Sequence, residues 1–129
     1  MRAIDTNVIV RFLTGDDPRQ AARARRVIGE GDIFVPTSVV LESEWVLRSA
    51  YGFSSDRVVQ ALRAFAGLPG IAFEDGALIA RALEWTEQGM EFADALHLGQ
   101  SNGCSIFLSF DRRLSRIAAG LSDVEVALP

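Results

Sequence analysis

Short apolar runs alternate with longer amphipathic segments along the chain. Short runs of consecutive apolar residues between turn residues are typical of buried strands, whereas apolar residues spaced three and four apart are typical of helices. The pattern predicts strands at residues 2–4, 33–35, 71–73, 106–108 and 124–126. It predicts helices at residues 7–13, 18–29, 37–50, 54–66, 75–88, 92–101 and 111–119.

Several helix boundaries carry their own signals. Pro18 favours the first turn of a helix, because its ring fixes φ and its missing N–H would have no partner there. Thr37 or Ser38 is expected to cap the helix over 37–50, and Ser54 or Ser55 the helix over 54–66. Their hydroxyl groups can accept hydrogen bonds from the free N–H groups of the first turn.

Strands that alternate with helices predict a parallel sheet covered by helices. We therefore expect an α/β fold with three layers, α/β/α, in which helices flank a central parallel sheet. The length favours a single domain over residues 1–129, and 49% hydrophobic residues are enough for a substantial core.

Composition excludes several classes of function. All 13 basic residues are arginines, and the lack of lysine excludes P-loop and Schiff-base chemistry. The single cysteine, Cys104, excludes an intramolecular disulfide, and with the single histidine, His97, it supplies too few ligands for a structural zinc site. No apolar run is long enough to span a bilayer, and Arg2 stands where a signal peptide would need apolar residues. We expect a cytoplasmic protein without membrane contact.

Four carboxylates fall close to the ends of predicted strands. Asp5 follows the first strand and Asp111 follows the strand at 106–108, while Glu42 and Asp94 lie early in helices among apolar neighbours. In an open α/β sheet, functional groups gather at the carboxyl ends of the strands. We therefore expect these four acids at one edge of the sheet.

Each acid also has a structural interpretation. Asp5 and Asp111 are good helix N-caps, and Asp94 in a first turn suits the helix dipole. Glu42 can pair with Arg48 or lie on a solvated face. Taken singly, these interpretations are at least as good as a functional one. Together, the four charges favour a bound cation, because two like charges about 4 Å apart repel by about 4 kcal/mol at an effective dielectric near 20.

Oxygen ligands without histidine or thiolate select Mg²⁺ or Mn²⁺ over zinc. Such metals commonly handle phosphate and can activate water for attack on a phosphodiester. The net charge of −4 argues weakly against a nucleic-acid partner, but the acids outside this quartet equal the arginines in number. A charge of −4 is therefore compatible with RNA binding once the quartet holds metal.

The sequence resembles a known family in four segments. These are Asp5-Thr6-Asn7, Glu42 in an apolar helix, Phe92-Ala93-Asp94-Ala95-Leu96-His97 and Leu108-Ser109-Phe110-Asp111. Their order and spacing resemble the PIN domain, and the length resembles the VapC toxins of bacterial type II toxin–antitoxin systems. Glu91 stands where the family more often has Asp, and Ser109 where it more often has Thr.

This resemblance implies a metal-dependent ribonuclease. By similarity, Asp5 and Asp94 hold the principal Mg²⁺, Glu42 binds it directly or through water, and Asp111 completes the site or a second metal position. Thr6, Asn7 and Ser109 match polar positions that orient ligands or substrate. The family also implies a homodimer and a small antitoxin whose tail lies in the nuclease groove.

Arginines supply candidate contacts to RNA phosphates, with a solvated face as an equal alternative. The candidates are Arg19, Arg23, Arg26, Arg112 and Arg113. His97 is expected in a structural role beside Asp94 rather than as a general acid, and Trp45 and Trp85 in the core or at a dimer contact.

Three other functions compete with the nuclease. A haloacid-dehalogenase-type phosphatase needs a second Asp at the position of Asn7, and a response-regulator receiver needs a lysine. A catalytically silent RNA- or partner-binding module is the remaining alternative, and loss of one of the four acids would be its mark.

Overall fold

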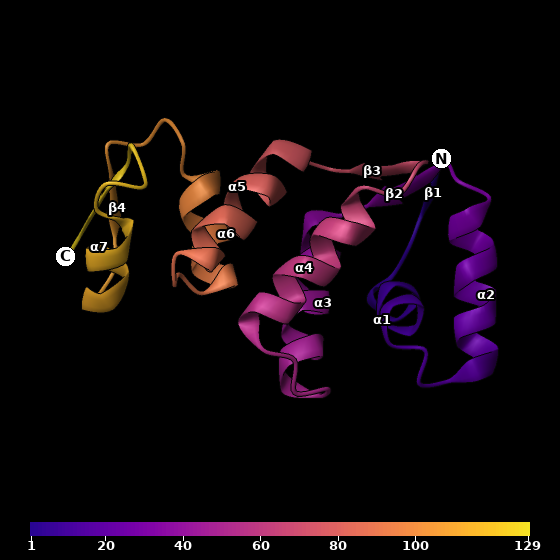
Figure 1. Ribbon diagram of the computed structural model, residues 1–129. Helices are drawn as coiled ribbons and strands as arrows, with labels where there is room; N and C mark the ends of the chain where they lie inside the picture. Colours follow the sequence, from indigo (N-terminus) through magenta and orange to yellow (C-terminus); the bar gives the residue numbers. More distant parts are fainter. The chain divides into compact units, whose positions relative to one another are not determined.

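The computed structural model describes all residues from 1 to 129 and divides into two compact units, Met1–Gly76 and Ala77–Pro129 (Figure 1). The first unit contains β1 (Arg2–Ala3), α1 (Thr6–Thr14), α2 (Pro18–Gly29), β2 (Ile33–Val35), α3 (Thr37–Ser49), α4 (Ser55–Ala66) and β3 (Ile71–Phe73). Helix α5 (Gly76–Glu87) begins at the boundary, and the second unit continues with α6 (Phe92–Gln100), β4 (Ile106–Leu108), α7 (Arg112–Ala118) and β5 (Glu125–Ala127).

In the first unit, three short strands form a parallel sheet in the order β1-β2-β3. Helices α1 and α2 connect β1 to β2, and helices α3 and α4 connect β2 to β3, so the chain crosses the sheet twice in the same direction. Because such crossovers are right-handed, all four helices are expected on one face of this sheet. The contacts of α1 with α2 and with α3 agree with that arrangement (Figure 1). Phe65 of α4 lies edge-on to Phe12 at 5.9 Å and to Phe73 at 6.3 Å between ring centroids, and so joins α4 to α1 and β3.

In the second unit, β4 and β5 pair in parallel and α7 forms the crossover between them. Ser115 of α7 donates its hydroxyl hydrogen to the carbonyl of Val126 at 3.0 Å, which ties the helix to β5. Helices α5 and α6 bury apolar residues such as Leu83 and Phe92. No helix of the protein is long and apolar enough to cross a membrane.

The α/β class and the parallel strand pairing agree with the expectation from sequence. Strands β2, β3 and β4 and helix α2 have the predicted bounds, and Ser54 caps α4 as expected by accepting from the Arg57 N–H at 3.2 Å. The last strand begins at Glu125 rather than at Val124, because the Val124 N–H donates to the Ser122 hydroxyl at 3.0 Å.

The expected cap of α3 by Thr37 or Ser38 is wrong. The N-cap is Pro36, which has no side-chain cap, and the Thr37 N–H donates instead to the Glu74 carboxylate at 2.9 Å. Glu74 directly follows β3, so the acceptor for this N–H in the first turn of α3 comes from a residue distant in the sequence.

Two glycines come into close contact before β2 and β3. Gly31 and Gly70 both have positive φ, and a Cβ on Gly70 would lie 2.7 Å from the Gly31 Cα. At Gly70, only glycine is compatible with both the left-handed backbone and this approach, whereas at Gly31 the positive φ alone favours glycine. The Gly70 carbonyl accepts from the Ile33 N–H at 2.9 Å, so the two turns are joined by a hydrogen bond as well as by packing.

A polar network joins α1, the following turn, α2 and the residue Tyr51 after α3. Arg11 donates Nη1–H bonds to both carboxylate oxygens of Asp16, at 2.9 and 3.1 Å, and to the Tyr51 hydroxyl at 2.8 Å. Tyr51 in turn donates to Asp16 at 2.6 Å, and Thr14 donates to Asp16 at 3.0 Å. The hydrogen bond to Asp16 and partial burial raise the pKa of Tyr51, and the same bond is the main cause that lowers the pKa of Asp16.

Replacing Asp16 by Asn should lower the pKa of Tyr51, because the phenol then no longer donates to a carboxylate. Tyr51 is the single tyrosine, so an ultraviolet absorbance titration reports it alone. In the parent protein the transition should lie above the ordinary value of about 10. The hydrogen bond from Tyr51 to Asp16 should therefore stabilise the folded state at neutral pH, and this stabilisation should be lost as the pH rises through the pKa of Tyr51 in the folded protein.

Asp32→Asn is the matched control, because Asp32 pairs with the amino terminus and lies outside the network. An unchanged Tyr51 transition in Asp16→Asn, or an equal shift in both variants, would contradict the assignment.

Candidate active site

In the first unit, Asp5 and Glu42 are held through one threonine. Asp5 follows β1 and caps α1, and its carboxylate accepts from the Thr6 N–H at 2.7 Å. The buried Thr6 hydroxyl donates to Oε1 of Glu42 on α3. Thr6 therefore holds both carboxylates, while Asp5 and Glu42 themselves are exposed. The proposed N-cap role of Asp5 is confirmed. Arg48 pairs with Glu44, one turn away along α3.

In the second unit, Asp94, Asp111 and Glu91 line one small pocket of about 30 Å³. Asp94 lies in the first turn of α6 and is partly buried. Burial raises the pKa of the Asp94 carboxyl, the negative charges of Glu91 and Asp111 raise it further, and His97 lowers it. The pocket therefore concentrates negative charge that the protein only partly compensates.

Asp111 also has a structural role. Its carboxylate caps α7 by accepting from the N–H groups of Arg113 at 2.9 Å and Leu114 at 3.1 Å. The hydroxyl of Ser109 accepts from the Asp111 N–H at 3.0 Å. Ser109, which the sequence analysis gives as a supporting residue, thus holds the backbone of Asp111 through this hydrogen bond.

Glu91 was not among the site residues expected from sequence. It is the N-cap residue of α6 without a side-chain cap bond, three residues before Asp94. Spacing of three residues at a helix start places two side chains on one face, and that spacing was the available signal.

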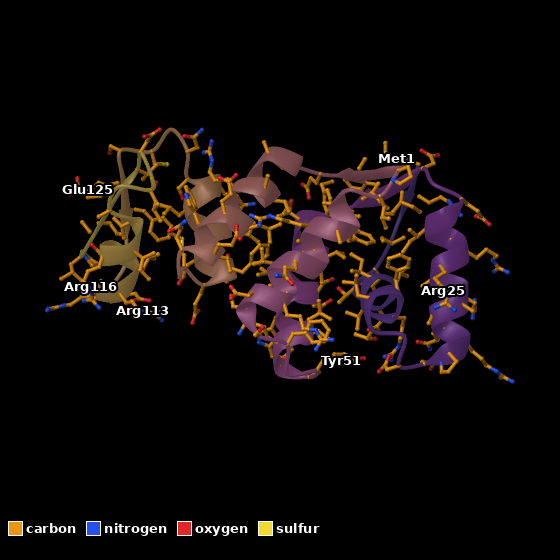
Figure 2. All side chains as sticks on the ribbon, viewed as in Figure 1. Met1, Arg25, Tyr51, Arg113, Arg116 and Glu125 are labelled. Carbon is orange, nitrogen blue, oxygen red and sulfur yellow. The ribbon has the colours of Figure 1, made fainter.

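The remaining candidates lie on helices of both units. Asn7 is exposed on the first turn of α1, and Arg19, Arg23 and Arg26 are exposed on α2. Arg112 and Arg113 are exposed on α7, where Figure 2 shows Arg113 and Arg116. Trp85 is buried, whereas Trp45 on α3 is 59% exposed.

These donors fit a divalent cation in their chemistry. Carboxylate oxygens are ligands that Mg²⁺ and Mn²⁺ prefer. Arg113 lines the same pocket, and His97 lowers the pKa of Asp94, but burial and the two neighbouring acids keep this pKa raised, which a bound cation would counteract. Neither unit by itself contains a group of three or more His, Cys, Asp or Glu side chains in a geometry that could hold a metal ion.

A scan of protein families matches residues 3–120 to the PIN domain. This chain belongs to the PIN domain family, and its α/β fold is the PIN fold. A comparison with curated protein sequences finds no match. Among solved structures, the chain is similar to VapC20 of Mycobacterium tuberculosis, which is described as a sarcin-ricin loop cleaving toxin. The identity is 21%, with a TM-score of 0.44, over 97% of this chain and 99% of that chain.

Two substitutions of Asp111 separate the effect of its helix cap on stability from the effect of its negative charge. Asp111→Ala should destabilise the protein by about 1 kcal/mol, because two N–H groups of α7 lose their acceptor. Asp111→Asn keeps an acceptor and should stay close to the parent. Urea unfolding followed by circular dichroism measures both. Equal destabilisation by Asn and Ala would show that the charge, not the cap, stabilises α7.

Proposed function

We propose that this chain is a metal-dependent endoribonuclease and the toxin of a type II toxin–antitoxin pair. The observation that carries the proposal is the pocket lined by Glu91, Asp94 and Asp111 in a chain of the PIN domain family. A pocket that gathers acids and raises the pKa of one of them is typical of a functional site. The family match extends through both units, which supports treating residues 1–129 as one domain.

In this proposal, Asp5, Glu42, Asp94 and Asp111 would hold Mg²⁺ or Mn²⁺. A bound divalent metal activates water and neutralises charge on the leaving oxygen during attack on an RNA phosphodiester. The local bonds of each unit support these roles. The Thr6 hydroxyl bonds Oε1 of Glu42 and leaves Oε2 for a ligand, and the cap bonds fix the carboxylate of Asp111.

The other proposed roles concern partners. Exposed arginines on α2 and α7 would bind the phosphates of the RNA, because a planar guanidinium donates two parallel hydrogen bonds to a phosphate. Those arginines are Arg19, Arg23, Arg26, Arg112 and Arg113. We further propose a homodimer, a small antitoxin as partner and action in the cytoplasm, all from the resemblance to VapC toxins.

The purified protein, freed of any partner, should cleave total RNA in Mg²⁺ or Mn²⁺ and lose this activity in EDTA. Asp94→Asn should reduce the rate by at least a hundredfold, because it removes a charge from the metal site. Gel electrophoresis of the RNA products is the measurement. Asp123→Asn is the control, since it makes the same acid-to-amide change in an exposed loop of the same unit.

Cleavage that persists in EDTA, or equal rates for Asp94→Asn and the parent, would disprove the metal mechanism. An inert parent protein that still binds RNA would support the silent binding module instead.

Expression of the chain alone should arrest bacterial growth, and Asp94→Asn should abolish the arrest. Co-expression of the product of a small neighbouring gene should restore growth of the parent strain. Growth curves with immunoblots for protein level are the measurement. If cells grow normally although their lysate contains enough active nuclease to degrade RNA, the chain is not a toxin.

A further inference from the structure

A pocket of about 320 Å³ lies between α1 and α2 in the first unit. Its lining combines two guanidinium groups, two amides and three apolar side chains, with no acid among them. The residues are Asn7, Val8, Arg11, Gln20, Arg23, Ala24 and Val27. Gln20, Arg23, Ala24 and Val27 recur at helical spacing, so one face of α2 forms one wall.

Arg11 is fixed at the pocket by bonds that use only part of its guanidinium. Nε donates to Oε1 of Gln20 at 2.7 Å, and Nη1 donates to Asp16 and Tyr51. Nη2 has no protein partner. Oε1 of Gln20 accepts one hydrogen bond from Arg11, and the NH₂ group of the same amide supplies further donors. Arg11 and Gln20 therefore both keep donor groups for a ligand.

Arg23 adds an uncompensated positive charge to the same pocket. It lies three residues after Gln20 on α2, is exposed and forms no ion pair. Val8, Ala24 and Val27 supply an apolar wall beside these donors. Donors with a free cation favour phosphate oxygens, and an apolar wall suits the ribose or base attached to them.

Asn7 connects this pocket with the candidate active site. It lies on the first turn of α1, two residues after Asp5, and it lines the pocket. The helix rises about 9 Å from Asp5 to Arg11. A short stretch of single-stranded RNA spans that distance, so a strand with its scissile phosphate near Asp5 reaches the pocket with a neighbouring phosphate.

We propose that the pocket between α1 and α2 is a subsite for a backbone phosphate of RNA, next to the phosphate that is cut. Arg23 binds this phosphate together with Nη2 of Arg11 and the NH₂ group of Gln20. The apolar wall packs against the attached nucleoside. This proposal rests on the proposed ribonuclease function, since it names a binding subsite for the same substrate.

The test compares Arg23→Gln with Arg25→Gln. Both residues lie on α2, both changes remove one positive charge, and Arg25, shown on α2 in Figure 2, does not line the pocket. Fluorescence anisotropy with a short labelled single-stranded RNA measures binding in EDTA, where no metal-dependent cleavage occurs. Thermal melting of each variant confirms that it is folded.

Arg23→Gln should raise the Kd for this RNA by about fivefold to tenfold. It should also lower the slope of log Kd against log salt by about 0.7, the value for one phosphate contact on a single strand. Arg25→Gln should change the Kd by less than about twofold. A labelled polyglutamate peptide, titrated in the same way, tests for a protein carboxylate as ligand.

Equal effects of the two variants on RNA binding would overturn the subsite. Loss of peptide binding in Arg23→Gln with unchanged RNA binding would overturn it in favour of an acidic peptide. The result is independent of the nuclease. A parent protein that does not cleave RNA but binds it through Arg23 refutes the proposed activity alone, whereas a cleaving protein with equal variants refutes the subsite alone.

Discussion

Asp5 and Asp111 each stand between a strand and a helix, and each uses its carboxylate as a helix N-cap. The local positions of Asp5 and Asp111 depend on this interaction. A cap fixes the side chain against the backbone, so the carboxylate has a defined position before any ligand arrives. It also orients the helix start, and through Thr6 the first cap reaches Glu42. The cap role of these two acids is therefore compatible with the proposed role as metal ligands.

Asp94 differs from the other three acids, because neither a backbone N–H nor a hydroxyl group compensates its charge. Its surroundings instead raise the pKa through burial and through Glu91 and Asp111. An ionised carboxylate in this environment is costly, and a cation relieves the cost. Binding of a metal would thus favour the ionised form of Asp94. Of the four acids, Asp94 is therefore the one whose ionisation a bound metal would change most.

Local signals made much of the fold predictable. Pro18 marked the start of α2, and short apolar runs marked β2, β3 and β4, because both depend on neighbours in sequence. Predictions failed where a distant residue decided the outcome, as with Thr37, whose N–H is satisfied by Glu74. For the candidate site, the sequence predicted the four acids, and their role as metal ligands stays a prediction. The part of Glu91 in the pocket depends on how α6 packs near α7, which local patterns do not encode.

The contact between Gly31 and Gly70 lies at the amino ends of β2 and β3, at the opposite end of the strands from Asp5 and Glu42. A methyl group on Gly70 would push the two turns apart, so this end of the sheet depends on a glycine at that position. The carboxyl end carries polar residues on loops and helix starts, where a change alters chemistry without disturbing strand pairing. Substitutions at the carboxyl end of this sheet can therefore change its surface chemistry, while the glycine contact at the other end preserves the strand register.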